Sequence, residues 1–396
     1  MRGRGEQEPA TAHHTTAERA SQAYDAMQRH LYLDGARLYR ESVPPAPGGN
    51  PFAFLWPFEE AAKATLCMRG LPEIGQRYPD DLENVVDRQA YWQPRRITGV
   101  VRKRSFASYP PLPLGQGGDT YFDDNTWVAL DLVQAHRMRV AGLMGGRAAV
   151  LERARTLFEL VVAGWCIDPR PYPGGVYWVD ASWNRDRGAA VTAGLAVLAL
   201  HLFELATPET IPASAQESEA ARARYLDHAQ SAYRWLRETL WCADGETAGL
   251  YHDKVLDDGT VDGSQWIYNQ GVAIAAGVML FRATGDTTYL EHAQTTADAA
   301  LRWYGGQGYT GQPSIFVAIF FRNLLQLAAL EDHPAYLAAM QAYADAAWDN
   351  PSIHDPATGL FRFDGPDSPC TLLDQSAMVQ ILALLSWPTE QYRLLA

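Results

Sequence analysis

The sequence has no long apolar run. None of its segments approaches the ~20 consecutive apolar residues that a membrane-spanning helix needs. The first residues, MRGRGEQEPATAHHTT, include arginines, but no apolar stretch follows them as it would in a secretory signal. We therefore expect no membrane span. As written, the chain predicts a cytoplasmic protein, or a secreted one if a leader is missing from it.

Basic charge is also scarce. The chain has 33 Lys and Arg against 46 Asp and Glu, a formal net charge of −13. Proteins that bind nucleic acid carry basic stripes that neutralise phosphates, and this sequence shows none. The charge balance excludes a nucleic-acid partner and suits an enzyme that acts on a neutral substrate.

Cysteine is rare and scattered. The four cysteines stand at Cys67, Cys166, Cys242 and Cys370 and form no CxxC pair, which argues against a zinc site. We expect buried free thiols. The acidic stretch LDDGTVDG does not have the spacing of an EF-hand loop, so we interpret it as a solvated turn. The sequence therefore predicts no metal and no cofactor.

The 396 residues contain no Pro/Gly/Ser-rich linker or charge run that would divide the chain. We expect a disordered segment over residues 1–14 and a single domain over 15–396. Nearly every periodic segment of this domain indicates a helix. The expected helices are His14–Tyr39, Phe52–Gly70, Pro79–Trp92, Asp124–Ala141, Gly146–Gly164, Arg187–Leu205, Glu217–Trp241, Trp266–Thr284, Asp286–Tyr304, Pro313–Leu330, Pro334–Asn350 and Leu372–Ser386.

These helices alternate in character. The odd ones are amphipathic, whereas the even ones, such as RGAAVTAGLAVLALHLFEL, are apolar nearly all round and must be covered on all sides. A repeat supports this pairing, because YLDHAQ at residue 225 returns as YLEHAQ at residue 289. We predict an all-α fold, an (α/α)6 barrel of six helical hairpins with the even helices inside. An open solenoid is the alternative.

The connections alternate as well. Links from an even helix to the next odd one are mostly short, and links from odd to even are mostly long. In a barrel of antiparallel hairpins all the long links lie at one end, together with the first residues of the inner helices. Because function concentrates in long loops on a rigid scaffold, we expect the active site at that end.

Two adjacent carboxylates, Asp123 and Asp124, open the fourth helix after the long loop GQGGDTYF. Aspartate is a preferred helix cap, so a lone pair of this kind usually caps its helix. Here the helix is apolar, and the desolvation free energy of burying two charges is large for a helix cap alone. Retaining glycosidases hold two carboxyl groups about 5–5.5 Å apart, a separation that adjacent helical residues reach. We expect one of the two to be more deeply buried and protonated, and to act as the acid.

Other inner helices also open with polar or aromatic residues, which would meet at the same mouth. Flat aromatic rings pack on the apolar faces of sugars while polar groups hydrogen-bond their edges. The candidate substrate-binding residues are Trp56, Asn125, Trp127, Trp178, Tyr268, Asn269, Gln270 and Asp374. Helix capping and core packing are the alternative roles for these side chains.

The stretch YFDDNTWVALDLVQAHR resembles the hallmark segment of glycoside hydrolase family 76, the endo-α-1,6-mannanases. Further similar pieces follow in the family's order: GGVYW, YNQGV, IFVAIFFRNL and DQSAMV. The resemblance implies an (α/α)6 barrel and retaining hydrolysis of α-1,6-mannosidic bonds in mannan or mannooligosaccharides. It also implies that Asp123 is the nucleophile and Asp124 the acid/base.

The sequence departs from the family's pattern in the loop before the sixth helix. Tyr177-Trp178 stands where the family has two tryptophans, and the loop continues as VDASWNRDR. We expect altered sugar subsites there.

Other functions remain open. A sugar epimerase on the same barrel would use histidines at the mouth, and the histidines here do not cluster at the starts of inner helices. A transglycosylase shares the covalent intermediate of a retaining hydrolase. A glycan-binding protein would need no paired aspartates. The expected partner is an oligo- or polysaccharide substrate similar to mannan, whereas an epimerase would act on free monosaccharides. We expect a monomer.

Overall fold

The computed structural model describes residues 14–97, 100–146, 149–207, 210, 215–331 and 333–396. The segment predicted to be disordered therefore lies outside the described residues except for His14. The first helix begins directly after it, where Thr15 caps α1 and Glu18 completes a capping box. In the described part of the chain, no helix is both long and apolar enough to cross a bilayer.

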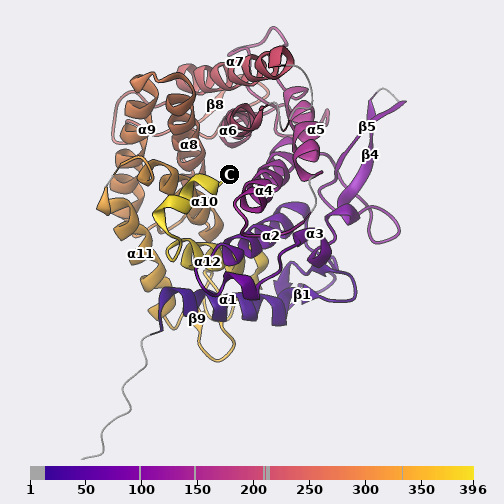
Figure 1. Ribbon diagram of the computed structural model, residues 1–396, viewed down its shortest axis with the longest axis vertical. Coiled ribbons are helices and arrows are strands. Elements are labelled where there is room, and N and C mark those ends of the chain that lie inside the picture. Colours follow the sequence, from indigo (N-terminus) through magenta and orange to yellow (C-terminus); the bar gives the residue numbers. More distant parts are fainter. Residues whose placement is uncertain (1–13, 98–99, 147–148, 208–209, 211–214, 332) are drawn as a thin grey trace, which may run out of the picture.

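Within the described residues, six helices form a closed inner ring (Figure 1). Each packs against the next in sequence, and α12 packs against α2, so the ring closes and the open solenoid is excluded. The inner helices are α2 (Leu55–Arg69), α4 (Phe122–Val140), α6 (Ala189–Leu205), α8 (Ile267–Thr284), α10 (Ser314–Ala328) and α12 (Leu372–Leu384).

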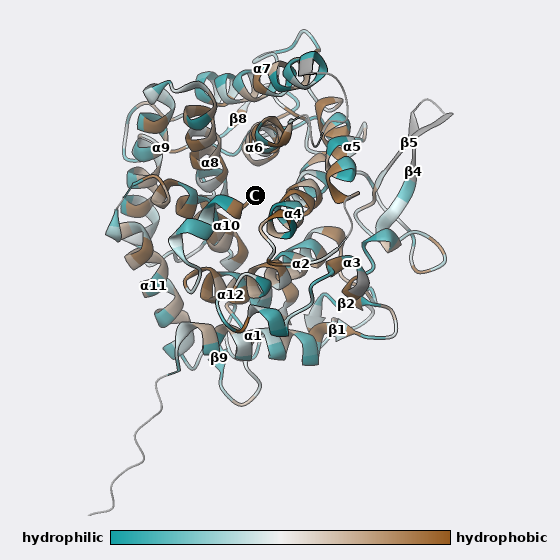
Figure 2. Ribbon diagram, in the orientation of Figure 1, coloured by the Kyte–Doolittle hydropathy of each residue, from teal (hydrophilic) through white to brown (hydrophobic). Residues whose placement is uncertain are grey.

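In the described part of the chain, five long helices surround this ring, each packed mainly on one inner helix and also touching a neighbouring one. The main pairs are α5 on α4, α7 on α6, α9 on α8, α11 on α10 and α1 on α12. They are α1 (Thr16–Leu31), α5 (Val150–Val162), α7 (Ala215–Thr239), α9 (Thr287–Ala300) and α11 (Pro334–Asp349). Figure 2 shows hydrophilic residues on the outward sides of the outer helices and hydrophobic ones inside. The single-domain (α/α)6 barrel predicted from the alternation of apolar and amphipathic helices is confirmed.

The predicted bounds of two outer helices, His14–Tyr39 and Pro79–Trp92, are wrong in part. The first ends at Leu31, because Asp34-Gly35 turns the chain into a hairpin of β1 (Tyr32–Leu33) and β2 (Leu38–Tyr39). The third shrinks to α3 (Leu82–Val85) and the 3-10 turn Arg88–Tyr91. The aspartates at both ends of α3 favour caps and turns over helix interiors.

The chain after this turn forms the hairpin of β4 (Trp92–Ile97) and β5 (Val100–Phe106), which projects from the side of the barrel (Figure 1). The sixth position of the outer ring is therefore filled by a short helix, a turn and this hairpin.

The long loops at the N-terminal ends of the inner helices are joined by small sheets. β3 (Ser42–Val43) pairs with β11 (Cys370–Thr371), which connects the first loop to the last. β6 (Arg187–Gly188), β7 (Lys254–Val255) and β8 (Val261–Asp262) form a three-stranded sheet between the third and fourth loops. A further pair, β9 (His354–Asp355) with β10 (Leu360–Phe361), lies before α12. These pairings hold the loops in place around the mouth of the barrel.

The chain ends inside the ring (Figure 1). After the 3-10 helix Thr389–Leu394, the last residue is buried, and Arg322 of α10 donates a hydrogen bond to the carbonyl oxygen of Ala396. The backbone N–H of Ala396 donates to Gln134 of α4. The barrel interior is thus filled from this side, while the mouth with the long loops stays open.

Candidate active site

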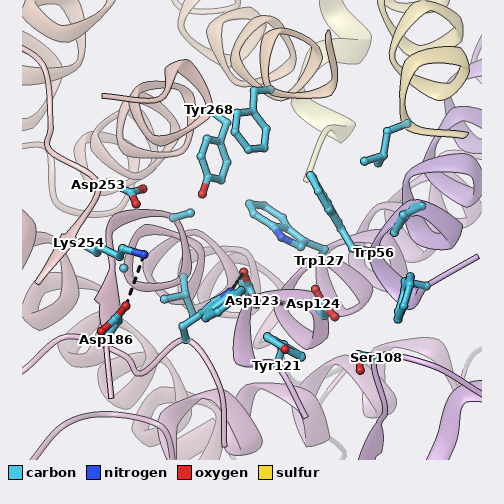
Figure 3. A pocket seen from close by; sticks show the side chains of 18 of the residues that line it. Trp56, Ser108, Tyr121, Asp123, Asp124, Trp127, Asp186, Asp253, Lys254 and Tyr268 are labelled. Carbon is cyan, nitrogen blue, oxygen red and sulfur yellow. Dashed lines mark hydrogen bonds and ion pairs between the residues drawn. The ribbon is translucent and has the colours of Figure 1, made fainter. Parts of the chain in front are cut away.

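A pocket of about 530 Å³ opens at the mouth of the barrel. Seven aromatic rings line it: Phe54, Trp56, Tyr121, Trp127, Trp178, Tyr268 and Phe316. Five carboxyl groups also reach it: Glu41, Asp123, Asp124, Asp186 and Asp253. Figure 3 shows Asp123 and Asp124 side by side at the start of α4, facing the space enclosed by Tyr268, Trp127 and Trp56. Aromatic faces combined with acidic groups are the composition expected of a sugar-binding cleft.

Asp123 accepts two hydrogen bonds. The indole Nε1 of Trp178 donates to Oδ2 at 2.8 Å, and the backbone N–H of Asp124 donates to Oδ1 at 3.0 Å. Burial raises the pKa of Asp123 to about 6, and both donors oppose that rise by stabilising the carboxylate. At neutral pH Asp123 is therefore ionised, with its charge held toward the pocket.

Asp124 lies in a different electrostatic setting. Burial raises its pKa well above the usual carboxyl value, and the charges of Asp123 and Glu59 raise it further. No side chain of the described residues donates a hydrogen bond to its carboxyl group. The environment therefore favours the protonated form, so the pair combines a carboxylate with a neighbouring carboxylic acid.

The charge behind Asp124 comes from a cluster of buried ionic residues inside the barrel. Glu59 pairs with Arg88, whose Nε lies 2.8 Å from Oε1 of Glu59. Lys63 lies 3.1 Å from Glu60 and 3.4 Å from Asp131, with its ammonium 5.5 Å from the ring centre of Trp127. Sequence periodicity does not reveal this cluster, because charged residues on α2 resemble the solvent face of an outer helix.

The aromatic residues form two walls. Tyr268 stacks on Phe316 with ring centres 4.0 Å apart and an interplanar angle of 17°. Trp56 lies 6.0 Å from the same Phe316 ring, so α2, α8 and α10 share this wall. On the other side Tyr121 packs edge-on against Trp178 at 4.8 Å. Trp127 is almost fully buried, yet its ring borders the pocket.

A polar group lies at the opposite end of the pocket from Ser108 (Figure 3). The ammonium of Lys254 is 3.4 Å from Oδ2 of Asp186, and Asp253 accepts a hydrogen bond of 3.0 Å from Nδ2 of Asn269. Burial raises the pKa of Asp253, and the Asn269 bond partly opposes this. The aromatic wall and this polar group face each other across the space in front of Asp123.

Several predicted substrate-binding amides lie outside the pocket. Asn125 is fully buried: its Oδ1 accepts from the backbone N–H of Phe106 at 3.0 Å, and its Nδ2 donates to the Phe106 carbonyl. Gln270 makes the same two bonds with the backbone of Tyr251, at 2.8 and 3.0 Å. Each is the fourth residue of its inner helix and clamps the loop that precedes it.

The other predicted positions divide between the pocket and its surroundings. Trp56, Trp127, Trp178 and Tyr268 line it with the two aspartates. Asn269 is buried behind Asp253 and does not line it. Asp374 lies in a separate cavity of about 680 Å³, where it accepts hydrogen bonds from Ser314 at 2.6 Å and Thr371 at 2.8 Å. Among the residues that the structure describes, only Leu373 borders both cavities.

The glycine pair before Trp178 has a steric origin. Gly175 has φ of +75°, and a Cβ there would lie 2.6 Å from the Trp235 ring. Gly174 has φ of +101°, and a Cβ there would lie 2.9 Å from the same ring. A side chain at either position would displace the segment that carries Trp178 to Asp123.

Comparison with known proteins decides the family. Residues 82–364 match the family described as glycosyl hydrolase family 76. The chain belongs to this family. The resemblance seen in the sequence is therefore confirmed, and this family 76 protein is a glycosidase by membership. No curated protein matches it by sequence.

Solved structures share the fold of this family 76 protein. A family 76 mannosidase from Bacteroides thetaiotaomicron VPI-5482 superposes with a TM-score of 0.76 at 21% identity, over 94% of this chain and 98% of the other. An inactive variant of an α-1,6-mannanase from Salegentibacter sp. HEL1_6, in complex with α-1,6-mannotriose, superposes with 0.66 at 19% identity, over 93% and 99%. Dfg5 from Chaetomium thermophilum, in complex with glucosamine, gives 0.60 at 15% identity, over 97% and 92%.

Sequence reasoning missed several residues of the pocket. Three of them, Asp186, Asp253 and Lys254, lie in the long loops before α6 and α8. Their position in those loops was the one sequence feature that could have indicated a place in the pocket. Phe316 looked like an ordinary core residue of α10, and only its stacking on Tyr268 places it in the pocket. All four cysteines are buried and unpaired. Within the described residues, no group of three or more His, Cys, Asp or Glu is arranged to hold a metal ion.

Proposed function

We propose that this family 76 protein is a retaining glycoside hydrolase that cleaves α-1,6-mannosidic linkages in mannan or mannooligosaccharides. The observation that carries the proposal is that two adjacent carboxyl groups in one pocket differ in their hydrogen-bond donors and in the charges around them. Asp123 accepts N–H donors from Trp178 and from the backbone, whereas Asp124 accepts none from a side chain and faces the charges of Asp123 and Glu59.

In the first step, the ionised Asp123 attacks the anomeric carbon and forms a covalent glycosyl ester. Asp124 donates its proton to the leaving glycosidic oxygen as that bond breaks. In the second step, Asp124 takes a proton from water, and the resulting hydroxide displaces Asp123 from the anomeric carbon. Two inversions give net retention. The roles agree with those implied by the family resemblance, although the hydrogen bonds of this pocket support them independently.

The substrate class rests on the relatives. The Salegentibacter enzyme is an α-1,6-mannanase whose inactive variant has two consecutive aspartates replaced and was bound to α-1,6-mannotriose. The chain presented here carries consecutive aspartates at the start of α4 in the same fold. The aromatic walls and the polar Asp186–Lys254–Asp253 group suit a neutral sugar with several hydroxyl groups.

The test is hydrolysis of α-1,6-mannan and α-1,6-mannooligosaccharides, followed by NMR of the anomeric proton of the first product. We expect the α-anomer first, and loss of turnover by about 10²–10⁴-fold in Asp124→Asn. Asp123→Asn is expected to lose at least as much. Asp286→Asn is the matched control, because Asp286 caps the outer helix α9 and asparagine caps helices equally well.

The remaining alternatives predict other outcomes. An epimerase would convert free mannose and leave the polymer intact, but none of the described histidines lines the pocket. A transglycosylase would yield longer products when a second sugar is supplied as acceptor. A glycan-binding protein would bind the mannan with no turnover. A β-anomeric first product, or full activity in both Asp→Asn variants, would refute the proposed mechanism.

A further inference from the structure

The aromatic wall on the Tyr121 side extends beyond the pocket. Trp178 borders the pocket, and Trp183 lies next to it with ring centres 6.2 Å apart and planes at 83°. Trp183 also approaches the Tyr121 ring, at 6.5 Å. These rings form a continuous aromatic surface that leads outward from Asp123.

Trp183 exposes an unusually large apolar surface. It is 58% exposed, more than any other tryptophan of the chain, and Trp178 follows at 36%. Large exposed apolar side chains cost solubility, so a cluster of them beside a pocket indicates a binding surface.

The ring is nevertheless held in place. Its indole Nε1 donates a hydrogen bond of 2.8 Å to Oδ2 of Asp119, the residue just before the Thr120–Tyr121 segment. Edge-to-face contacts with Trp178 and Tyr121 also restrict its orientation. Since Trp183 is nevertheless more than half exposed, a large part of the ring remains accessible to a ligand.

The loop that carries Trp183 is closed at its base. The N–H of Trp178 donates to the carbonyl of Asp186 at 2.9 Å, which joins the two ends of the loop. The N–H of Asp180 donates to the carbonyl of Thr120 at 2.9 Å, and Tyr121 bridges Val179. The ring therefore stands on a pre-organised loop and would lose little conformational entropy when it binds a ligand.

We propose that the exposed face of Trp183 is an additional sugar subsite, which binds a unit of the glycan chain outside the pocket. This inference rests on the proposed function. A pyranose presents an apolar face that stacks on an indole, and the path over Trp178 connects such a unit to the bond cleaved at Asp123.

The subsite predicts a dependence on chain length. In Trp183→Ala, we expect KM for α-1,6-mannooligosaccharides of five or six sugars to rise about three- to tenfold, with kcat unchanged. For the disaccharide, which is too short to fill both places, KM and kcat should match those of the wild type. Trp183→Phe keeps a flat ring and should retain most of the affinity for long substrates.

Ile167→Ala is the control, because Ile167 is 88% exposed on the preceding part of the same connection and does not border the pocket. Equal KM values for wild type and Trp183→Ala at every length would overturn the subsite. An equal loss of kcat at every length would also overturn it, since that pattern indicates disturbance of Trp178 and Asp123. If the wild-type protein cleaves no α-1,6-mannoside, the proposed function fails first and the subsite fails with it.

Discussion

The indole Nε1 of Trp178 lies 2.8 Å from Oδ2 of Asp123 and donates a hydrogen bond to it. The bond joins the loop before α6 to the first turn of α4, and it reaches only one of two adjacent carboxyl groups. A charged acceptor makes such a bond stronger than one between neutral groups. This contact therefore distinguishes Asp123 from Asp124 in charge as well as in position.

Removing the donor should shift the pH dependence. In Trp178→Phe the ring stays but the N–H is lost, so the carboxylate of Asp123 loses stabilisation and its pKa rises. We expect the acid limb of kcat/KM to move to higher pH by about one pH unit, and kcat/KM at that limb to fall roughly tenfold. Trp303→Phe, on the outer side of the barrel, should leave the profile unchanged. An unshifted limb in Trp178→Phe would show that the bond does not control Asp123.

The wild-type protein should have a bell-shaped pH profile. Activity requires ionised Asp123, whose pKa is raised to about 6, so it should fall as the pH drops through about 6. Activity also requires the proton on Asp124, whose pKa lies well above the usual carboxyl range, so it falls again at higher pH. The measurement is kcat/KM from pH 4 to 9.

The alkaline limb can be assigned by changing the leaving group. In an aryl mannoside with an acidic phenol, the phenolate leaves without being protonated. Asp124→Asn should therefore lose far less activity on this substrate than on mannan. Its alkaline limb should also disappear. If the limb persists in Asp124→Asn, it belongs to another group.

The two amide clamps should contribute stability and leave substrate affinity unchanged. Asn125→Leu and Gln270→Leu each leave a buried backbone N–H and C=O without their partner, at Phe106 and Tyr251. We expect each change to lower the free energy of unfolding by about 1–3 kcal/mol, measured by urea denaturation. Gln341→Leu, on the half-buried side of α11, should change it by less than about 0.5 kcal/mol. A rise in KM in the folded Asn125→Leu protein, without loss of stability, would instead place this amide in a sugar subsite.

Gly175 should be intolerant of a side chain. Gly175→Ala adds the strain of a positive φ and a Cβ 2.6 Å from the Trp235 ring, which together should cost about 2–5 kcal/mol of stability. Gly245→Ala is a matched control, since its φ is +81° with no atom within 4 Å of the added Cβ. It should cost only about 1–2 kcal/mol. Equal costs in thermal or urea denaturation would contradict the steric explanation.

Much of the barrel was predictable from local pattern. Apolar helices alternating with amphipathic ones leave few arrangements that bury every apolar face, and the long loops on alternate links indicate which end is open. Asp123 and Asp124 were selected as candidates because they open an inner helix at this end, and not because an adjacent pair of aspartates is distinctive in itself. The hairpin of β4 and β5 was missed, because it lies between the expected helices Pro79–Trp92 and Asp124–Ala141, in a connection that was interpreted as a long loop.

The chemistry of individual side chains was harder to predict. Asn125 and Gln270 look like sugar ligands in the sequence, yet the structure turns both amides toward the backbone of the preceding loop. No sequence pattern distinguishes Asp253 or Phe316. Asp253 lies in the loop before α8 and Phe316 lies on α10, and both border the pocket. Glu59 looks like a surface residue, yet it is buried and its charge raises the pKa of Asp124.

The sequence by itself determined the helical barrel, the end at which its long loops gather and the family to which it belongs, because these depend on periodicity and on short motifs. Only the tertiary structure decided which polar groups share one cavity and which of two neighbouring aspartates receives a donor. Those properties depend on interactions between residues far apart in the chain, such as the hydrogen bond of Trp178 with Asp123 and the electrostatic effect of Glu59 on Asp124, and no local pattern encodes them.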